Sequence, residues 1–414
     1  MSAVGFEQVP LPTYLRAANR VAALAGSDAS FFAPERIFAD AARHAGLPEQ
    51  FPEHVSEAVE VLCRSLRDEA DLHWFGRSLQ HNLLVTGLSA FLRVEKAFAD
   101  DPTLENEPLV PPLIVTGLPR SGTTFLHRLL AAEPEATAVS LLQHTHPLPY
   151  KPLDYRWIEV GARFKPWRAA GAAYQMDAMH YVRPSLPDEC NFGMRLAGRS
   201  MIYWAMAPAY SYIRWLLDQD LRETYQLYRK VLILHQRCAP GRRITLKCPH
   251  HLAWLPALQE ALPEAMIVQT HRDPIETIPS ECKLILSLQG ITTRSLDWRR
   301  TVEGNVHKVR TFAERAVSAA DAPQGDKIKH VDYRMLVADP LETVKEIHSH
   351  FGLPFTAAHD EALSQFAAGN RQHKHGQNTY SVEQFGHTTS GLAADFAAYR
   401  ARFLDNGGDI RGAG

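Results

Sequence analysis

The stretch that decides the fold is PPLIVTGLPRSGTTFLHR, residues 111–128. An apolar run ends in a loop that is bracketed by Gly117 and Gly122, and a segment with helical apolar spacing follows it. This succession predicts a short buried strand, a tight loop and a helix. Backbone N–H groups and the helix dipole both favour negative charge at the start of a helix. The stretch therefore predicts a corner of the fold that binds an anion.

The loop departs from a common phosphate-binding pattern at one position. Gly117 and Gly122 have the spacing of the motif Gly-x-x-x-x-Gly-Lys-[Ser/Thr], but Thr123 stands where that motif has lysine. Thr123 and Thr124 can still offer hydroxyl donors, and Arg120 supplies a fixed positive charge from inside the loop. A phosphate-loop kinase or NTPase is an alternative function, and the missing lysine argues against it.

Three more short apolar runs follow the loop, and helical segments separate them. They are RITLKC (243–248), AMIVQTH (265–271) and DKIKHVDY (326–333). Short buried strands that alternate with helices are typical of a parallel sheet covered by helices on both faces. The expected fold class is therefore α/β, with a phosphate-loop-type parallel sheet flanked by helices.

Outside the expected strands, two long regions show helical patterns of apolar residues. Residues 1–108 contain no convincing strand, and we expect a helical N-terminal section that packs on a main domain at 109–400. A long helical stretch rich in aromatic residues at 188–237 interrupts the alternation of strands and helices. We expect most of these aromatic side chains in the core and a few in the wall of an apolar pocket. Residues 401–414 form a tail, and we expect its stretch DNGGDIRGAG (405–414) to be disordered.

The composition excludes several classes of protein. The chain has 414 residues, of which 44 are basic and 46 acidic, so it lacks the basic surplus of a nucleic-acid-binding protein. Its five cysteines have neither disulfide-framework nor zinc-ligand spacing. We see no signal peptide and no apolar run long enough to span a bilayer. We therefore expect a cytoplasmic protein without a transmembrane segment, which could act as a monomer or as an oligomer.

Polar residues follow two of the other expected strands. Lys247 and His251 lie in LKCPHHL (246–252), and Arg272 and Ser280 lie in HRDPIETIPS (271–280). The carboxyl ends of parallel strands gather at one edge of a sheet, where ligands bind. Arg272 and Ser280 are therefore expected to hold a second phosphate beside the anion site of the loop.

These blocks, in this order, resemble the sulfotransferases that use 3′-phosphoadenosine-5′-phosphosulfate (PAPS), and in particular the bacterial branch of that family. Residues 333–355 (YRMLVADPLETVKEIHSHFGLPF) and 373–386 (HKHGQNTYSVEQFG) resemble further blocks, so the resemblance covers residues 109–400. It implies transfer of a sulfuryl group from PAPS to a hydroxyl or amine of an unidentified small or lipid-like acceptor. No metal is expected, because the sulfuryl group carries less charge than a phosphoryl group.

The resemblance also implies roles for individual residues. Arg120 would face the 5′-phosphosulfate, and Arg272 and Ser280 would hold the 3′-phosphate, which distinguishes PAPS from ATP. Arg120, Thr123 and Lys247 would stabilise charge on the bridging oxygen. The remaining donor-binding residues of the loop would be Gly117, Pro119, Ser121, Gly122 and Thr124.

The general base has three candidates. A histidine follows the strand lysine closely in related enzymes, and His251 matches that place best, with His250 as the adjacent alternative. A histidine that titrates near neutral pH suits this task. The rival is Glu189 in LPDECNF, since other branches of the superfamily use a carboxylate. Lys374 and His375 could in addition fold over the nucleotide.

Overall fold

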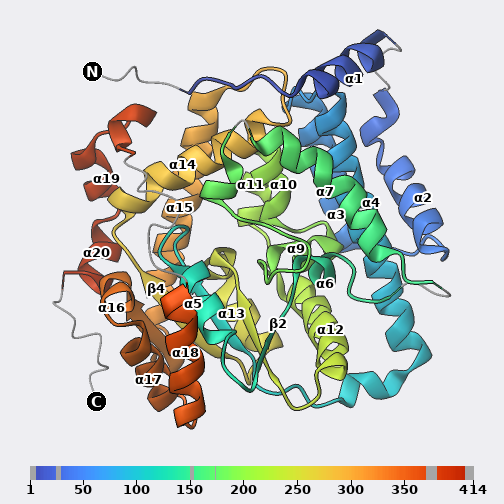
Figure 1. Ribbon diagram of the computed structural model, residues 1–414. Coiled ribbons are helices and arrows are strands. Elements are labelled where there is room, and N and C mark those ends of the chain that lie inside the picture. The colour runs from blue at the N-terminus through green and yellow to red at the C-terminus, as the bar shows by residue number, and fades with distance from the viewer. Residues whose placement is uncertain (1–5, 25–28, 150–152, 173, 370–379, 406–414) are drawn as a thin grey trace.

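A parallel sheet of five strands forms the centre of the protein (Figure 1). The computed structural model describes residues 6–24, 29–149, 153–172, 174–369 and 380–405. The strand order is β2-β3-β1-β4-β5, so the strand before the glycine-bracketed loop lies in the middle. The strands are β1 (Leu113–Gly117), β2 (Ala136–Ala138), β3 (Arg243–Lys247), β4 (Met266–His271) and β5 (Ile328–Asp332).

The register aligns the functional blocks at one edge of the sheet. Val115 of β1 lies beside Lys247 at the end of β3, and Gly117 lies beside Thr270 near the end of β4. The loop after β1 and the segments after β3 and β4 therefore start at the same edge. The α/β fold class is confirmed, although β2, a three-residue edge strand without an apolar run, could not be predicted from the pattern of residues.

Alternating side chains of β1 explain why helices cover both faces of the sheet. Leu113 and Val115 pack into one buried cluster, whereas Ile114 between them packs into another. Because successive side chains of a strand point to opposite faces, two hydrophobic cores are needed. The helices of the α/β part are α5 (Thr123–Leu130), α13 (Leu255–Ala261), α14 (Pro274–Gly290), α15 (Trp298–Ala320), α16 (Tyr333–Ala338), α17 (Pro340–His350) and α18 (Ala357–Gly369).

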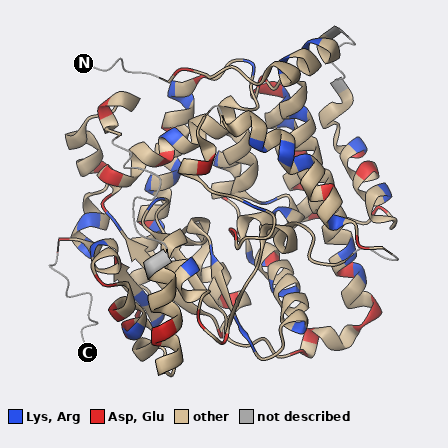
Figure 2. Ribbon diagram, in the orientation of Figure 1, with Lys and Arg blue, Asp and Glu red and all other residues tan. Residues whose placement is uncertain are grey.

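Within the described residues the N-terminal section contains helices and no strand. These helices are α1 (Thr13–Leu24), α2 (Pro34–Ala45), α3 (Glu53–Asp68) and α4 (Trp74–Asp100). The buried side chains of α2, α3 and α4 belong to the same large cluster as those of the middle section, so the two regions share one core. Figure 2 shows basic and acidic residues interspersed over the outer helices in this view.

The middle section is divided into many short helices rather than one long helical stretch. Residues 188–237 form four α-helices and a 3-10 helix, with turns such as the left-handed Gly198 between them. At the C-terminal end, α19 (Thr389–Asp395) and α20 (Ala397–Phe403) follow. Lys374, His375 and residues 406–414 lie outside the described residues. The middle helices are α6 (Leu141–Thr145), α7 (Arg156–Ala172), α8 (Met176–Met179), α9 (Asn191–Met194), α10 (Met201–Met206), α11 (Tyr210–Leu217) and α12 (Arg222–Cys238).

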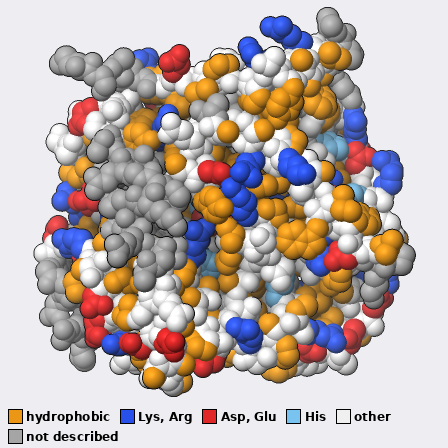
Figure 3. Space-filling view, in the orientation of Figure 1, with side chains coloured by type: hydrophobic (Ala, Val, Ile, Leu, Met, Phe, Trp, Pro, Cys, Tyr) orange, Lys and Arg blue, Asp and Glu red, His pale blue; other side chains and the backbone are white. Residues whose placement is uncertain are grey.

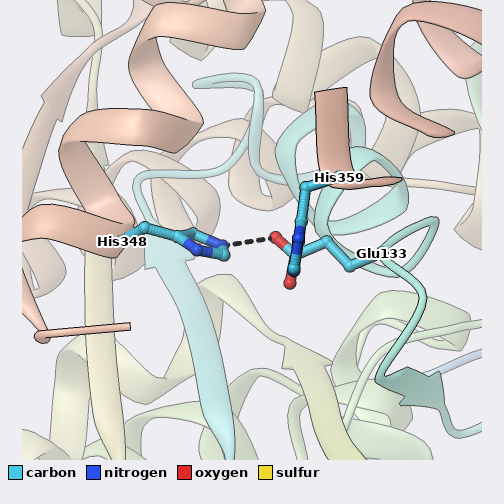
Figure 4. Close-up of side chains that lie close together, drawn as sticks. All are labelled: Glu133, His348 and His359. Carbon is cyan, nitrogen blue, oxygen red and sulfur yellow. Dashed lines mark hydrogen bonds and ion pairs between the residues drawn. The ribbon is translucent and has the colours of Figure 1, made fainter. Parts of the chain in front are cut away.

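A buried ion pair fastens the C-terminal helices to the sheet (Figure 4). Glu133, in the turn after α5, has one carboxylate oxygen 2.9 Å from His348 Nε2 of α17 and the other 3.1 Å from an Arg243 guanidinium nitrogen. His348 Nδ1 lies 2.8 Å from the carbonyl oxygen of Pro354. With His359, these side chains also have metal-ligand spacing, but Arg243 already neutralises the carboxylate.

Candidate active site

A cavity of about 970 Å³ lies at the edge of the sheet where the strands end. Its walls come from the loop after β1, the ends of β3 and β4, and α14, and from helices α4, α7 and α10 of the helical sections. In Figure 3 this region of the surface appears as a hollow with apolar and basic side chains around it. The cavity therefore joins the phosphate-loop-like part of the fold to the helical part.

The conformation of the loop depends on its glycines. Gly117 has φ +150°, and a Cβ there would lie 2.5 Å from the backbone oxygen of Thr270. Ser121 is buried, donates a hydrogen bond of 2.6 Å to the carbonyl of Leu118, and lies 2.7 Å from Thr270 Oγ1. Gly117 and Ser121 therefore shape the loop without lining the cavity. The loop residues that do line the cavity are Pro119, Arg120, Gly122, Thr123 and Thr124.

The structure brings the two expected anion sites together. Arg120 Nε donates a hydrogen bond of 3.1 Å to Ser280 Oγ, and Arg272 lies 3.4 Å from the carbonyl oxygen of Arg120. The Arg272 guanidinium also stacks on the ring of Tyr333, 4.3 Å from its centroid. Arg120, with φ +69°, adopts the left-handed conformation that is uncommon for a residue with a side chain. Two arginines and a serine thus form one polar wall of the cavity.

Lys247 and Glu189 form an ion pair on the cavity wall. Lys247 Nζ lies 2.7 Å from Glu189 Oε1, and Asn191 donates to the other carboxylate oxygen at 3.1 Å. The backbone N–H of Cys190 bonds to the carbonyl of Lys247, which places Glu189 beside the end of β3. Burial acts to raise the pKa of Glu189, but Lys247, His250 and His180 together lower it to about 2, with Lys247 contributing most among these three. Glu189 is therefore ionised at neutral pH.

The two adjacent histidines after β3 have different surroundings. His250 lines the cavity, and its Nδ1 lies 3.3 Å from Asn191 Nδ2. His251 is fully buried, does not line the cavity, and places its Nδ1 2.8 Å from the hydroxyl of Tyr225. Burial lowers the pKa of His250 to about 4 and that of His251 to about 3. The location of His251 behind the cavity wall argues against its expected role as the base.

Sequence reasoning did not single out Asp188 and His180, which also line the cavity. Asp188 Oδ1 accepts a hydrogen bond from the backbone N–H of Glu189 and lies 4.0 Å from His180 Nε2. Burial raises the pKa of Asp188 to about 7, against the effect of Lys247, and burial lowers the pKa of His180 to about 4. The sequence LPDECNF displays the acidic pair, but nothing in it reveals that Asp188 is buried.

The apolar walls come mainly from helices that were not predicted from the sequence to form part of the site. Among the described aromatic residues of the stretch 188–237, Phe192 is the one that lines the cavity. The other aromatic side chains of this stretch are chiefly buried in the core. Helix α14 carries Ser280 in the polar wall and Leu288 in the apolar wall, about 12 Å further along its axis. The apolar wall includes Leu79, Leu83, Val160, Phe164, Trp167, Met179, Ile202, Met206, Leu284, Ile285 and Leu288.

Two side chains of the cavity wall, Glu189 and His250, have metal-ligand spacing with Cys248, which is buried and does not line the cavity. The ligand atoms of Glu189, Cys248 and His250 lie within 4.8 Å of one another. Lys247 already neutralises Glu189, and burial raises the pKa of the Cys248 thiol well above its ordinary value. A thiolate is the form that binds metals, so both features disfavour a cation at this position.

Comparison with known proteins identifies the family. A model of the sulfotransferase family matches residues 111–357, more than half of the chain and the whole region of the polar wall. The chain belongs to the sulfotransferase family. The sulfotransferase is 25% identical over 291 residues to the omega-hydroxy-beta-dihydromenaquinone-9 sulfotransferase Stf3 of Mycobacterium bovis and of Mycobacterium tuberculosis. These alignments cover 66% of this chain and 71% of each relative.

Solved structures agree with this assignment. The sulfotransferase STF1 from Mycobacterium tuberculosis superposes with a TM-score of 0.72 at 28% identity, over 88% of this chain and 98% of that one. STF9 from Mycobacterium avium gives 0.77 at 25% identity, over 89% and 96%. The family resemblance and the sulfotransferase fold are therefore confirmed. Among the described residues, no helix combines the length and the apolar character needed to cross a bilayer.

Proposed function

We propose that this sulfotransferase moves a sulfuryl group from PAPS to a hydroxyl or amine on an apolar, lipid-like acceptor. The proposal depends chiefly on the contact of Arg120 with Ser280 and Arg272 at one side of a cavity whose other side is apolar. Two adjoining cationic positions suit a ligand with two separate phosphates. The lipid-like acceptor class is further supported by the relatives named as dihydromenaquinone sulfotransferases.

The polar wall fits the donor residue by residue. The 5′-phosphosulfate would be held by Arg120 of the loop and by Thr123 and Thr124 at the start of α5, where the helix dipole adds positive potential. Arg272 and Ser280 would hold the 3′-phosphate. The Tyr333 ring under Arg272 fixes the guanidinium in place before any ligand arrives. The cavity volume lies near the upper end of the range for small-molecule sites, which leaves room for an acceptor.

We assign the proton-accepting role to Glu189. The acceptor oxygen or nitrogen would give its proton to Glu189 and form a bond to sulfur, while the bond from sulfur to the 5′-phosphate oxygen breaks. The departing phosphate oxygen keeps the electron pair of that bond. Arg120, Thr123 and Lys247 would stabilise the charge that develops there, and each such donor contributes roughly 10²–10³ in rate.

Lys247 would connect donor binding to the strength of the base. Without the donor, Lys247 holds the pKa of Glu189 near 2, so the carboxylate is a weak base. A bound phosphosulfate competes for the same ammonium. When the ammonium turns to the donor, burial remains and raises the pKa of Glu189 towards a more useful range. Donor binding would in this way prepare the carboxylate for proton transfer.

Calorimetry with 3′-phosphoadenosine-5′-phosphate, adenosine 5′-phosphate and ATP with Mg²⁺ tests the donor site. We expect tight binding that requires the 3′-phosphate. Arg272→Ala should weaken binding of the bisphosphate by roughly 10–100-fold and leave binding of adenosine 5′-phosphate nearly unchanged. Arg334→Ala, at an exposed arginine outside the cavity, is the matched control.

Transfer of labelled sulfate to a panel of apolar alcohols, phenols and amines then tests the reaction itself. Equal losses for both adenosine ligands in Arg272→Ala would remove the 3′-phosphate assignment. Tight ATP binding that is indifferent to a 3′-phosphate would instead support the phosphate-loop kinase alternative.

A further inference from the structure

One apolar stripe of α7 begins inside the cavity and continues to the outside of the protein. Val160, Phe164 and Trp167 line the cavity, and their spacing of four and three residues places them on one side of the helix. Trp157 comes three residues before Val160 on the same side, but its side chain is 52% exposed. The stripe therefore leads from the apolar wall of the cavity to solvent.

The exposed end of this stripe is part of an apolar patch. Leu153 and Ile158 are each 75% exposed, and Tyr155 and Trp157 are about half exposed. We refer to these four side chains as the α7 patch. They make up nearly half of the large hydrophobic residues that are exposed in the described parts of the chain, although they occupy only residues 153–158. Single exposed apolar residues are ordinary, but a local group of them marks an interaction site.

Exposed basic residues lie on α7 beyond the α7 patch. Residues 153–183 contain five arginines and lysines and three acidic residues. Lys165 and Arg168 are exposed on α7, two and three turns after the patch. The face of the molecule onto which α7 projects shows apolar and basic side chains interspersed (Figure 3). An exposed helix with aromatic and aliphatic side chains beside lysine and arginine is typical of a helix that lies in the surface of an anionic bilayer.

We propose that the α7 patch docks the sulfotransferase on an anionic lipid bilayer, and that an apolar acceptor enters the cavity from the bilayer along α7. Tryptophan and tyrosine favour the region of the lipid headgroups, and the surplus of basic residues complements anionic lipids. A bilayer also explains why the exposed patch is continuous with the apolar wall of the cavity. The entry of the acceptor rests on the proposed function, whereas the docking does not.

Sedimentation of the full chain with lipid vesicles tests the docking. Vesicles of equal parts phosphatidylglycerol and phosphatidylcholine are compared with vesicles of phosphatidylcholine alone. We expect binding to the anionic vesicles that weakens when salt is added. The triple variant Leu153→Ser, Trp157→Ser and Ile158→Ser should lower the partition coefficient by at least about tenfold. None of these three residues lines the cavity.

Two further variants separate the apolar and the electrostatic contributions. Lys165→Gln with Arg168→Gln should lower binding to anionic vesicles by about tenfold and leave binding to neutral vesicles unchanged. Met335→Ser is the matched control, because Met335 is 60% exposed on α16 and lies outside the α7 patch. If the triple variant fails to fold, Ile158→Ser alone should still lower the partition coefficient by about fivefold.

Several results would overturn the proposal. Wild-type protein that stays in the supernatant with both kinds of vesicle would do so, as would variants of the α7 patch that sediment like the wild type. A wild-type dimer that the triple variant converts to a monomer in gel filtration would assign the patch to a contact between copies. Vesicle binding requires no sulfuryl transfer, so failure of the bisphosphate to bind would count against the proposed function and not against the docking.

Discussion

Binding of 3′-phosphoadenosine-5′-phosphate should draw a proton onto Glu189. In the free protein the Lys247 ammonium lies 2.7 Å from Glu189 Oε1 and holds the pKa of the carboxyl near 2. If Lys247 turns to the bound 5′-phosphate, this attraction is lost, whereas burial, which raises the pKa, remains. The pKa of Glu189 should then rise towards its ordinary value of about 4.3.

The size and the sign of the effect follow from this change at Glu189. A rise in the pKa from about 2 to about 4.3 exceeds two units, and each unit corresponds to about 1.36 kcal/mol. A carboxyl whose pKa rises on binding takes up a proton between the two pKa values, so binding tightens as the pH falls through that window. A bound pKa of about 4.3 gives an uptake of about 0.2 proton at pH 5, and a higher bound pKa gives a larger uptake.

Calorimetry at pH 5 in two buffers of different ionisation enthalpy measures this uptake. The phosphates of the ligand also exchange protons, so the quantity of interest is the difference between the wild type and Glu189→Gln. Asp188→Asn is the matched control, because the pKa of Asp188 is about 7 and this group is already protonated at pH 5. Equal uptake by the wild type and Glu189→Gln would refute the transfer of Lys247 from Glu189 to the donor.

Two further predictions concern the base and the buried ion pair. His251→Gln should leave the rate of transfer unchanged, because the ring lies behind the cavity wall, whereas Glu189→Gln should lower it by about 10²–10⁴ in single-turnover assays with labelled donor. The opposite pattern would assign the base to the histidine. Glu133→Gln should lower the free energy of unfolding in urea by about 3–5 kcal/mol, because it removes the buried carboxylate that pairs with Arg243 and contacts His348. Glu346→Gln, in an exposed pair, should cost less than about 1 kcal/mol, and equal losses would contradict this explanation.

The sequence was sufficient for the polar wall of the site. Strands β1, β3 and β4 are short apolar runs, and a parallel arrangement brings their carboxyl ends to one edge whatever the intervening helices do. Arg120 could therefore be expected near Arg272 and Ser280 although it is more than 150 residues from both along the chain. The local sequence pattern and the sheet topology together were enough to predict the polar wall.

The sequence was not sufficient for the choice between adjacent histidines. After Pro249 the chain forms a 3-10 turn, in which consecutive side chains point in different directions. A change of one residue in the phase of this turn would exchange His250 for His251 at the cavity. The pattern of apolar residues does not determine this phase, because the tertiary packing of Tyr225 against His251 decides it. The apolar wall could not be predicted either, because it is assembled from helices that are far apart in the sequence.

Helix α14 shows how one element can serve both halves of the site. Ser280 near its beginning belongs to the polar wall, and Leu284, Ile285 and Leu288 on its later turns belong to the apolar wall. Glu281, which is buried and follows Ser280, forms an ion pair with Lys308 of α15, with 2.8 Å between Oε1 and Nζ. This pair holds α14 against α15. The polar and apolar walls are therefore held at a set separation by one helix. Substitutions on the later turns of α14 can then change which acceptor fits without moving Ser280.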